Sequence, residues 1–90
     1  MKLLGLEKIT VIECEFAKKW LISWISEIRD AHWRGAEDIL KQFPKVSILE
    51  NQCFEFSIHN SKWVICLQIA FSQRIAIIKA VNIKGANNGI

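Results

Sequence analysis

The residues best suited to proton transfer and anion binding lie in the second half of the chain. They are His59, Lys62, Arg74, Lys79 and Lys84. An imidazole or an amine of suitable pKa can act as a general base or a general acid, and cationic side chains stabilise negative charge that develops on a phosphate. Each side chain also has a simpler interpretation as a solvated surface charge. Residue type and position therefore identify candidates for phosphate chemistry, and the fold decides which of them meet.

The composition limits the scaffold that can hold these residues. With 90 residues, the chain is expected to form one domain over residues 1–90. Apolar residues make up 51% of it and include four Trp and five Phe, which is enough for a core. We expect no membrane span and no signal peptide, because charged residues interrupt every apolar stretch before the roughly 18 residues that a span needs.

Cysteine usage and net charge indicate the cellular compartment of the protein and the kind of partner it could bind. Cys14, Cys53 and Cys66 form neither a CxxC pair nor a Cys/His cluster with metal-ligand spacing. We therefore expect reduced thiols in a cytoplasmic protein, with no metal site and no cofactor. The net charge of +3 and the pI near 8.9 are compatible with an acidic partner such as a nucleic acid, and equally with an ordinary solvated surface.

Two helices are predicted in the first half of the chain. In residues 16–28 the large apolar side chains recur every three or four positions, which is typical of an amphipathic helix. A second helix is predicted over residues 36–42, because Gly35 can open it and Pro44 disfavours helical geometry at Phe43. His32, between the two helices, is expected to be a structural histidine with its hydrogen bonds satisfied.

The second half of the chain predicts strands at residues 54–59, 63–71 and 74–81. An additional edge strand could come from residues 3–12 or 46–49, and each of these runs fits a helix nearly as well. The expected fold is α+β, with two N-terminal helices packed on an antiparallel sheet of three to four strands. The residues expected to be buried between helices and sheet are Trp20, Trp24, Phe54, Phe56, Ile65, Leu67 and Ile77.

A series of motifs runs through residues 21–81 in a fixed order. Leu21, Trp24, Ala31 and Trp33 are spaced as L-x-x-W-x6-A-x-W, and residues 38–49 read DILKQFPKVSIL. The strand FEFSI follows at residues 54–58. In order and spacing these motifs resemble the HigB-like toxins of the RelE superfamily, where a tryptophan-bearing helix leads to D-x-x-x-Q-F-P-x-x-S, an F-N-I strand, a turn and a Y-R-L strand.

The resemblance implies a RelE-like fold and a role in a type II toxin–antitoxin system. Members of this family resemble ribosome-dependent endoribonucleases that cut mRNA and are neutralised by a helix-turn-helix antitoxin. On this reading the partners are mRNA, the ribosome and that antitoxin. Fold is weaker evidence than a site, since one scaffold can host many functions.

The departures from the family pattern fall on its catalytic positions. Trp63 and Val64 occupy the places of the family's strand tyrosine and arginine. Residues 83–88 read IKGANN where the family has Thr-His-x-x-Tyr-Asp, so its histidine and tyrosine are replaced. Whether the chain is an enzyme is therefore open.

Two functions from different classes follow. The first is a HigB-like endoribonuclease in which His59, Lys62 and Lys84 are the catalytic candidates and Lys62, Arg74, Lys79 and Lys84 bind RNA. The second is a scaffold that has lost catalysis and acts as a binding or inhibitor protein encoded by a phage or another mobile element. In that case a protein target could use exposed apolar residues such as Val64.

Overall fold

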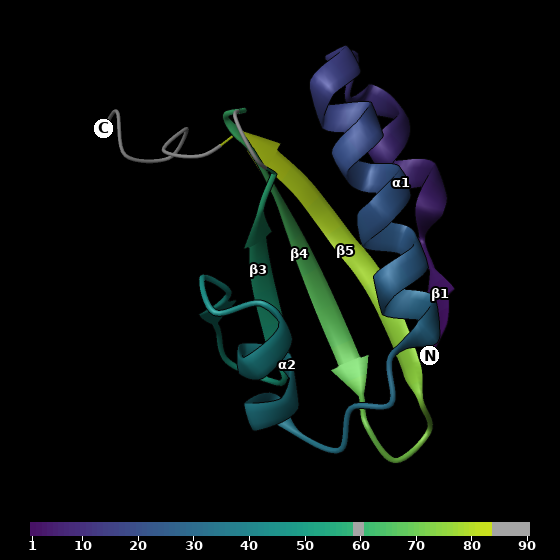
Figure 1. Cartoon of the computed structure of the whole chain (residues 1–90), viewed down its shortest axis with the longest axis vertical. Coiled ribbons are helices and arrows are strands. Elements are labelled where there is room, and N and C mark those ends of the chain that lie inside the picture. The colour runs from purple at the N-terminus through teal and green to yellow at the C-terminus, as the bar shows by residue number, and fades with distance from the viewer. Residues whose placement is uncertain (59–60, 84–90) are drawn as a thin grey trace.

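The computed structural model describes residues 1–58 and 61–83, in which helices pack against a five-stranded mixed sheet (Figure 1). The strand order is β1-β5-β4-β3-β2, so β4 is central. In chain order the elements are β1 (Lys2–Leu4), the 3-10 helix η1 (Leu6–Val11), α1 (Glu15–Asp30), α2 (Ala36–Gln42), β2 (Ser47–Ile48), β3 (Cys53–Ser57), β4 (Trp63–Ala70) and β5 (Ile75–Ile83). The α+β fold class and the two predicted helices are confirmed.

The sheet is larger than the expected three or four antiparallel strands. Both of the ambiguous runs contribute an edge strand: β2 pairs antiparallel with β3, and β1 pairs parallel with β5, with Lys2 opposite Ile75. The chain leaves β1 at Gly5, whose φ of 86° is left-handed. A Cβ at that position would lie 2.7 Å from the carbonyl oxygen of Ile78, so glycine permits both the turn and the close approach. Each edge strand is too short for periodicity to reveal it.

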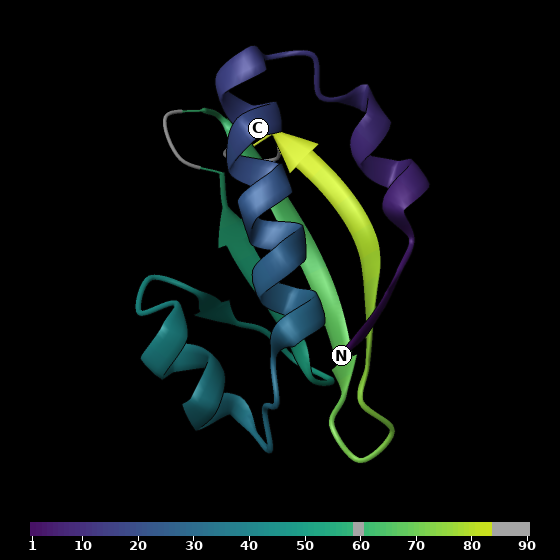
Figure 2. The same ribbon diagram turned by 45° about the vertical axis from the view of Figure 1, so that its right-hand side comes forward.

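The core lies between the two helices and the face of the sheet that they cover, and Figures 1 and 2 show the helices over this face from two directions. Helix α1 contributes Leu21, Trp24 and Ile28. The Trp24 ring meets Phe56 of β3 edge to face, with ring centres 5.5 Å apart. Of the seven side chains expected in the core, five are buried, namely Trp24, Phe54, Phe56, Ile65 and Leu67.

The other expectations for buried positions need correction. Trp20 is half-buried, and Ile77 is 36% exposed while its neighbour Ile78 is buried. The run of apolar residues in β5 does not reveal which side chains point inward; pairing with β4 does, because Ile78 lies opposite the buried Leu67. Phe16, the first of the large apolar residues in the helix predicted over residues 16–28, was expected on its buried face but is 75% exposed, and Ala17 is buried in its place.

One irregularity in β5 concerns a candidate residue. Leu67 pairs with Ile78 and Cys66 pairs with Ala80, so Lys79 is the extra residue of a β-bulge. Beyond the bulge the alternation of inward-facing and outward-facing side chains in β5 is displaced by one residue. Val81, and not Ala80, therefore lies opposite the buried Ile65.

Candidate nucleic-acid interface

The face of the sheet turned away from the helices carries most of the sheet's polar side chains. By strand register, Glu55 on β3, Cys66 on β4 and Ala80 on β5 form one row across it. Ser57, Val64 and Asn82 form the next row. Figures 1 and 2 place α1 and α2 on the opposite face. This open face and the turns at its two ends hold the described candidates for RNA contact.

Lys62 lies in the turn between β3 and β4 and is exposed. The turn is held by Ser61, whose hydroxyl donates to the carbonyl oxygen of Ile58 at 3.1 Å and accepts from the Trp63 N–H at 3.1 Å. The backbone at Lys62 is therefore fixed while its ammonium group faces solvent. Such a group can contact a phosphate without losing an internal partner.

Lys79 is exposed at the bulge of β5 and lies near Cys66. Burial, the neighbouring Cys53 and the carboxylate of Glu55 raise the pKa of the Cys66 thiol, and the ammonium of Lys79 acts in the opposite direction. Cys66 therefore stays a protonated thiol around neutral pH and is a weak nucleophile. The exposed ammonium group of Lys79 can therefore contact an anion at this part of the open face.

Arg74 lies at the other end of the sheet from Lys62. The two residues flank the strand Trp63–Ala70, which at about 3.3 Å per residue separates its ends by about 25 Å. Arg74 is exposed in the turn between β4 and β5. The structure thus divides the described candidates between the two ends of β4 and the bulge. His59 and Lys84 lie outside the described residues.

The two substituted family positions are not exposed to the same degree. Trp63 is half-buried and packs against the helix-side core. Val64 is only 4% exposed, so the expectation that it offers an apolar docking point is wrong. Its neighbours across the sheet, Ser57 and Asn82, are exposed. An arginine at the Val64 position would lie beside these polar side chains on the same face of the sheet.

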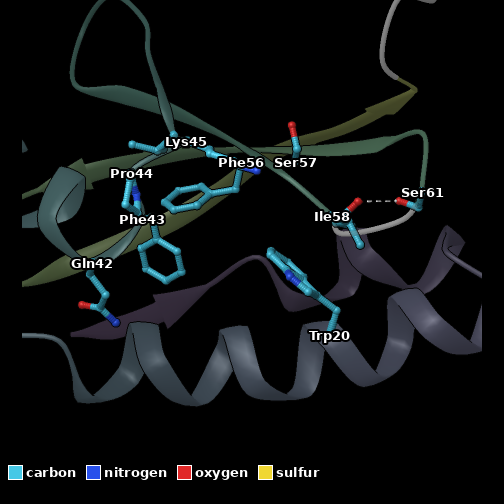
Figure 3. Close-up of a pocket in the computed structure, with 10 residues that line it drawn as sticks. Trp20, Gln42, Phe43, Pro44, Lys45, Phe56, Ser57, Ile58 and Ser61 are labelled. Carbon is cyan, nitrogen blue, oxygen red and sulfur yellow. Dashed lines mark hydrogen bonds between the residues drawn. The ribbon is translucent and has the colours of Figure 1, made fainter.

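A cavity of about 490 Å³ opens on the helix side of the hairpin formed by β3 and β4 (Figure 3). The sequence analysis did not predict it. Trp20 lines it, and Phe43 and Phe56 stand edge to face with ring centres 5.1 Å apart. Lys45 and Ser57 also line it, and the Ser57 hydroxyl points away from the aromatic rings (Figure 3). The outward face of Trp20 explains why this residue is only half-buried. The QFP motif was the available signal, because it places Phe43 and Pro44 directly after α2.

His32 does not behave as the satisfied structural histidine that was expected. It is exposed, and within residues 1–58 and 61–83 its side chain has no hydrogen-bond partner. The structural role belongs to its neighbour Trp33, whose indole N–H donates to the side-chain oxygen of Gln42 at 3.0 Å. His32 therefore remains available to solvent.

The described residues offer neither a candidate metal cluster nor a candidate membrane-spanning helix. They contain no group of three or more His, Cys, Asp and Glu side chains placed to hold a metal ion. No helix in the described ranges combines the length and apolar character needed to cross a membrane. Cys14, Cys53 and Cys66 form no disulfide.

A family model matches most of the chain. The family model for HigB toxin, described as the RelE-like toxic component of a toxin–antitoxin system, matches residues 17–83. That span contains nearly all of α1 and runs through α2 and the strands β2 to β5. No curated protein matches the chain. The suspected resemblance is therefore confirmed, and the chain belongs to the HigB toxin family, the RelE-like toxic components of toxin–antitoxin systems.

Proposed function

We propose that this protein is a toxin that cleaves mRNA on the ribosome in the cytoplasm and is neutralised by a helix-turn-helix antitoxin. The observation that carries the proposal is the family match over residues 17–83, which spans most of the helix-on-sheet scaffold. The exposed ammonium groups of Lys62 and Lys79, at the hairpin turn and the bulge, add phosphate-binding capacity.

The proposed reaction is transesterification of the RNA backbone. A base takes the proton of a 2′-hydroxyl, its oxygen attacks the adjacent phosphorus, and the bond to the 5′ oxygen breaks. An acid protonates that leaving oxygen, so the products are a 2′,3′-cyclic phosphate and a 5′-hydroxyl. We assign the proton transfers to His59 and Lys84 and stabilisation of the phosphorane to Lys62.

The experiment is expression of the full chain without any antitoxin, followed by mapping of the 5′ ends of cellular messages. We expect growth arrest with new 5′-hydroxyl ends in translated messages. His59→Ala, Lys62→Ala and Lys84→Ala should each relieve the arrest. Lys19→Ala is the matched control, because it removes an exposed cation from α1, on the other side of the sheet. Continued growth with soluble, folded protein would refute the enzyme.

A second candidate, a binding or inhibitor protein, is favoured by Val64. This apolar residue is buried where the family carries arginine, so that cation is lost and no exposed group replaces it at the same position. The same experiment discriminates the two functions. Growth arrest with intact messages would favour a protein that blocks its target, and cleaved messages would exclude this candidate.

A further inference from the structure

A second cavity, polar and of about 940 Å³, lies at the end of the sheet remote from Lys62. Three connections meet there: the loop between α1 and α2, the turn between β2 and β3, and the turn between β4 and β5. The first and third connections lie at the same end of the ribbon in Figures 1 and 2. The polar side chains that line the cavity are His32, Arg34, Gln52, Ser72, Gln73 and Arg74.

The charged residues that line this cavity are all basic. Two arginines and a histidine are among its lining residues, and none of these residues is acidic. Within the described residues, neither Arg34 nor Arg74 has a carboxylate within ion-pair distance. The nearby Asp38 carboxylate instead accepts the backbone N–H of Arg34 at 2.8 Å. Both guanidinium groups are therefore free to bind an external anion, and each offers a planar set of donors that matches phosphate oxygens.

The backbone that carries these side chains is firmly held. Arg74 and Gln52 have left-handed φ values of 57° and 59°, which non-glycine residues adopt only where their surroundings fix them. The Arg74 carbonyl accepts the N–H of Lys2 at 2.9 Å, and the Gln52 carbonyl accepts the N–H of Ile69 at 3.0 Å. The cations are thus presented from a fixed frame, which lowers the entropic cost of binding.

We propose that this cavity binds the phosphate backbone of RNA, at a site separate from the hairpin that carries Lys62. Its size exceeds the needs of a single phosphate, and Arg34 and Arg74 come from different connections, which suits successive phosphates of one strand. The site rests on the proposed function in that RNA is the substrate class, and it adds a docking contact about 25 Å along β4 from the proposed cleavage end.

The test is binding of a labelled single-stranded RNA oligonucleotide to the purified full chain over a range of salt concentrations. Arg34→Gln combined with Arg74→Gln should reduce the slope of log affinity against log salt by about 1.4, or about 0.7 per lost phosphate contact. Arg34→Lys with Arg74→Lys should restore most of the slope. Lys8→Gln with Lys19→Gln removes the same charge from exposed positions on η1 and α1 and should leave the slope unchanged.

An unchanged slope in the folded double Gln variant would overturn the inference, as would a slope that depends on Lys62 alone. Arg34→Gln by itself provides a safeguard against misfolding, because this side chain is exposed and makes no internal ion pair in the described structure. The outcome is separable from that of the cleavage experiment. RNA binding through Arg34 and Arg74 without cleaved messages would support this binding site and exclude the proposed endoribonuclease. Cleaved messages with an unchanged slope in the double Gln variant would support the endoribonuclease and exclude this binding site.

Discussion

The indole N–H of Trp33 donates to the side-chain oxygen of Gln42 at 3.0 Å, and the Gln42 amide nitrogen in turn donates to Glu27 at 3.3 Å. Trp33 also packs edge to face on Phe43, with ring centres 6.2 Å apart. These contacts tie the loop between α1 and α2 to both helices. Because that loop carries Arg34, the same contacts help to fix one wall of the polar cavity.

Replacing Gln42 with Ala should lower the free energy of unfolding by about 1–2 kcal/mol, because the largely buried Trp33 then loses its acceptor. Chemical denaturation measures the change. A double-mutant cycle with Trp33→Phe isolates the bond, since Gln42→Ala should cost clearly less once the indole N–H is gone. Equal costs in the two backgrounds would show that this hydrogen bond contributes nothing.

Replacing Trp24 with Ala should destabilise the fold by about 3–5 kcal/mol, because the side chain is 1% exposed at the centre of the core. Phe16→Ala is the matched control on the same helix, where a 75% exposed ring should cost little. Thermal and chemical unfolding of the two variants give the comparison. Similar losses for both would contradict the orientation of α1.

Trp24→Phe tests a separate feature of the same residue. The Trp24 indole nitrogen is buried without a hydrogen-bond partner in the described structure, so the wild type already carries the cost of an unsatisfied donor. Phenylalanine removes that donor and keeps most of the apolar area. We expect Trp24→Phe to cost less than half as much as Trp24→Ala in the same denaturation series.

Gly5→Ala should destabilise the protein by about 1–3 kcal/mol, because alanine at a φ of 86° is strained and its Cβ would press on the Ile78 carbonyl. The loss should appear first in β1, as faster amide exchange at the Leu4 and Ile77 pair. Gly35→Ala is the control, since a Cβ there meets no atom within 4 Å and the backbone is extended. Equal exchange rates in the two variants would exclude a special role for Gly5.

The raised pKa of Cys66 predicts a dependence of stability on alkaline pH. The folded state holds the thiol proton more tightly than the unfolded chain, so this group's contribution is complete below the ordinary pKa of 9.0 and is lost as pH rises above it. Cys66→Ser should remove this part of the decline. Alkylation followed by mass spectrometry should also modify the exposed Cys14 before Cys66 at neutral pH.

The sequence predicted those helices and strands in which the repeat of apolar residues extends over enough positions to be recognised. Helix α2 begins and ends at the expected residues, and the long central strand matches to within one residue, because its alternation extends over eight positions. The two edge strands could not be chosen, since three residues and two residues carry no period. The inward side of β5 was also misassigned, because Ile75, Ile77 and Ile78 are equally apolar and only pairing with β4 separates them.

The candidate site was predicted less well than the fold. Residue type nominated Lys62 and Arg74 together, but charge alone does not reveal that a full strand separates them. Arg34 and His32 were not selected as anion ligands because the loop that holds them meets the β4–β5 turn only in three dimensions. The available signal was the absence of acidic residues in the segments 32–34 and 70–74.

The parallel pairing of β1 with β5 has a consequence for how the chain matures during translation. Lys2 pairs with Ile75, so β1 has no partner in the sheet until β5 has been made. Long-range pairings of this kind raise contact order and slow folding, because the chain loses the entropy of loop closure before the stabilising contacts form. Of the pairings in the sheet, the one between β1 and β5 therefore spans the longest stretch of chain and can form only after β5 has been made.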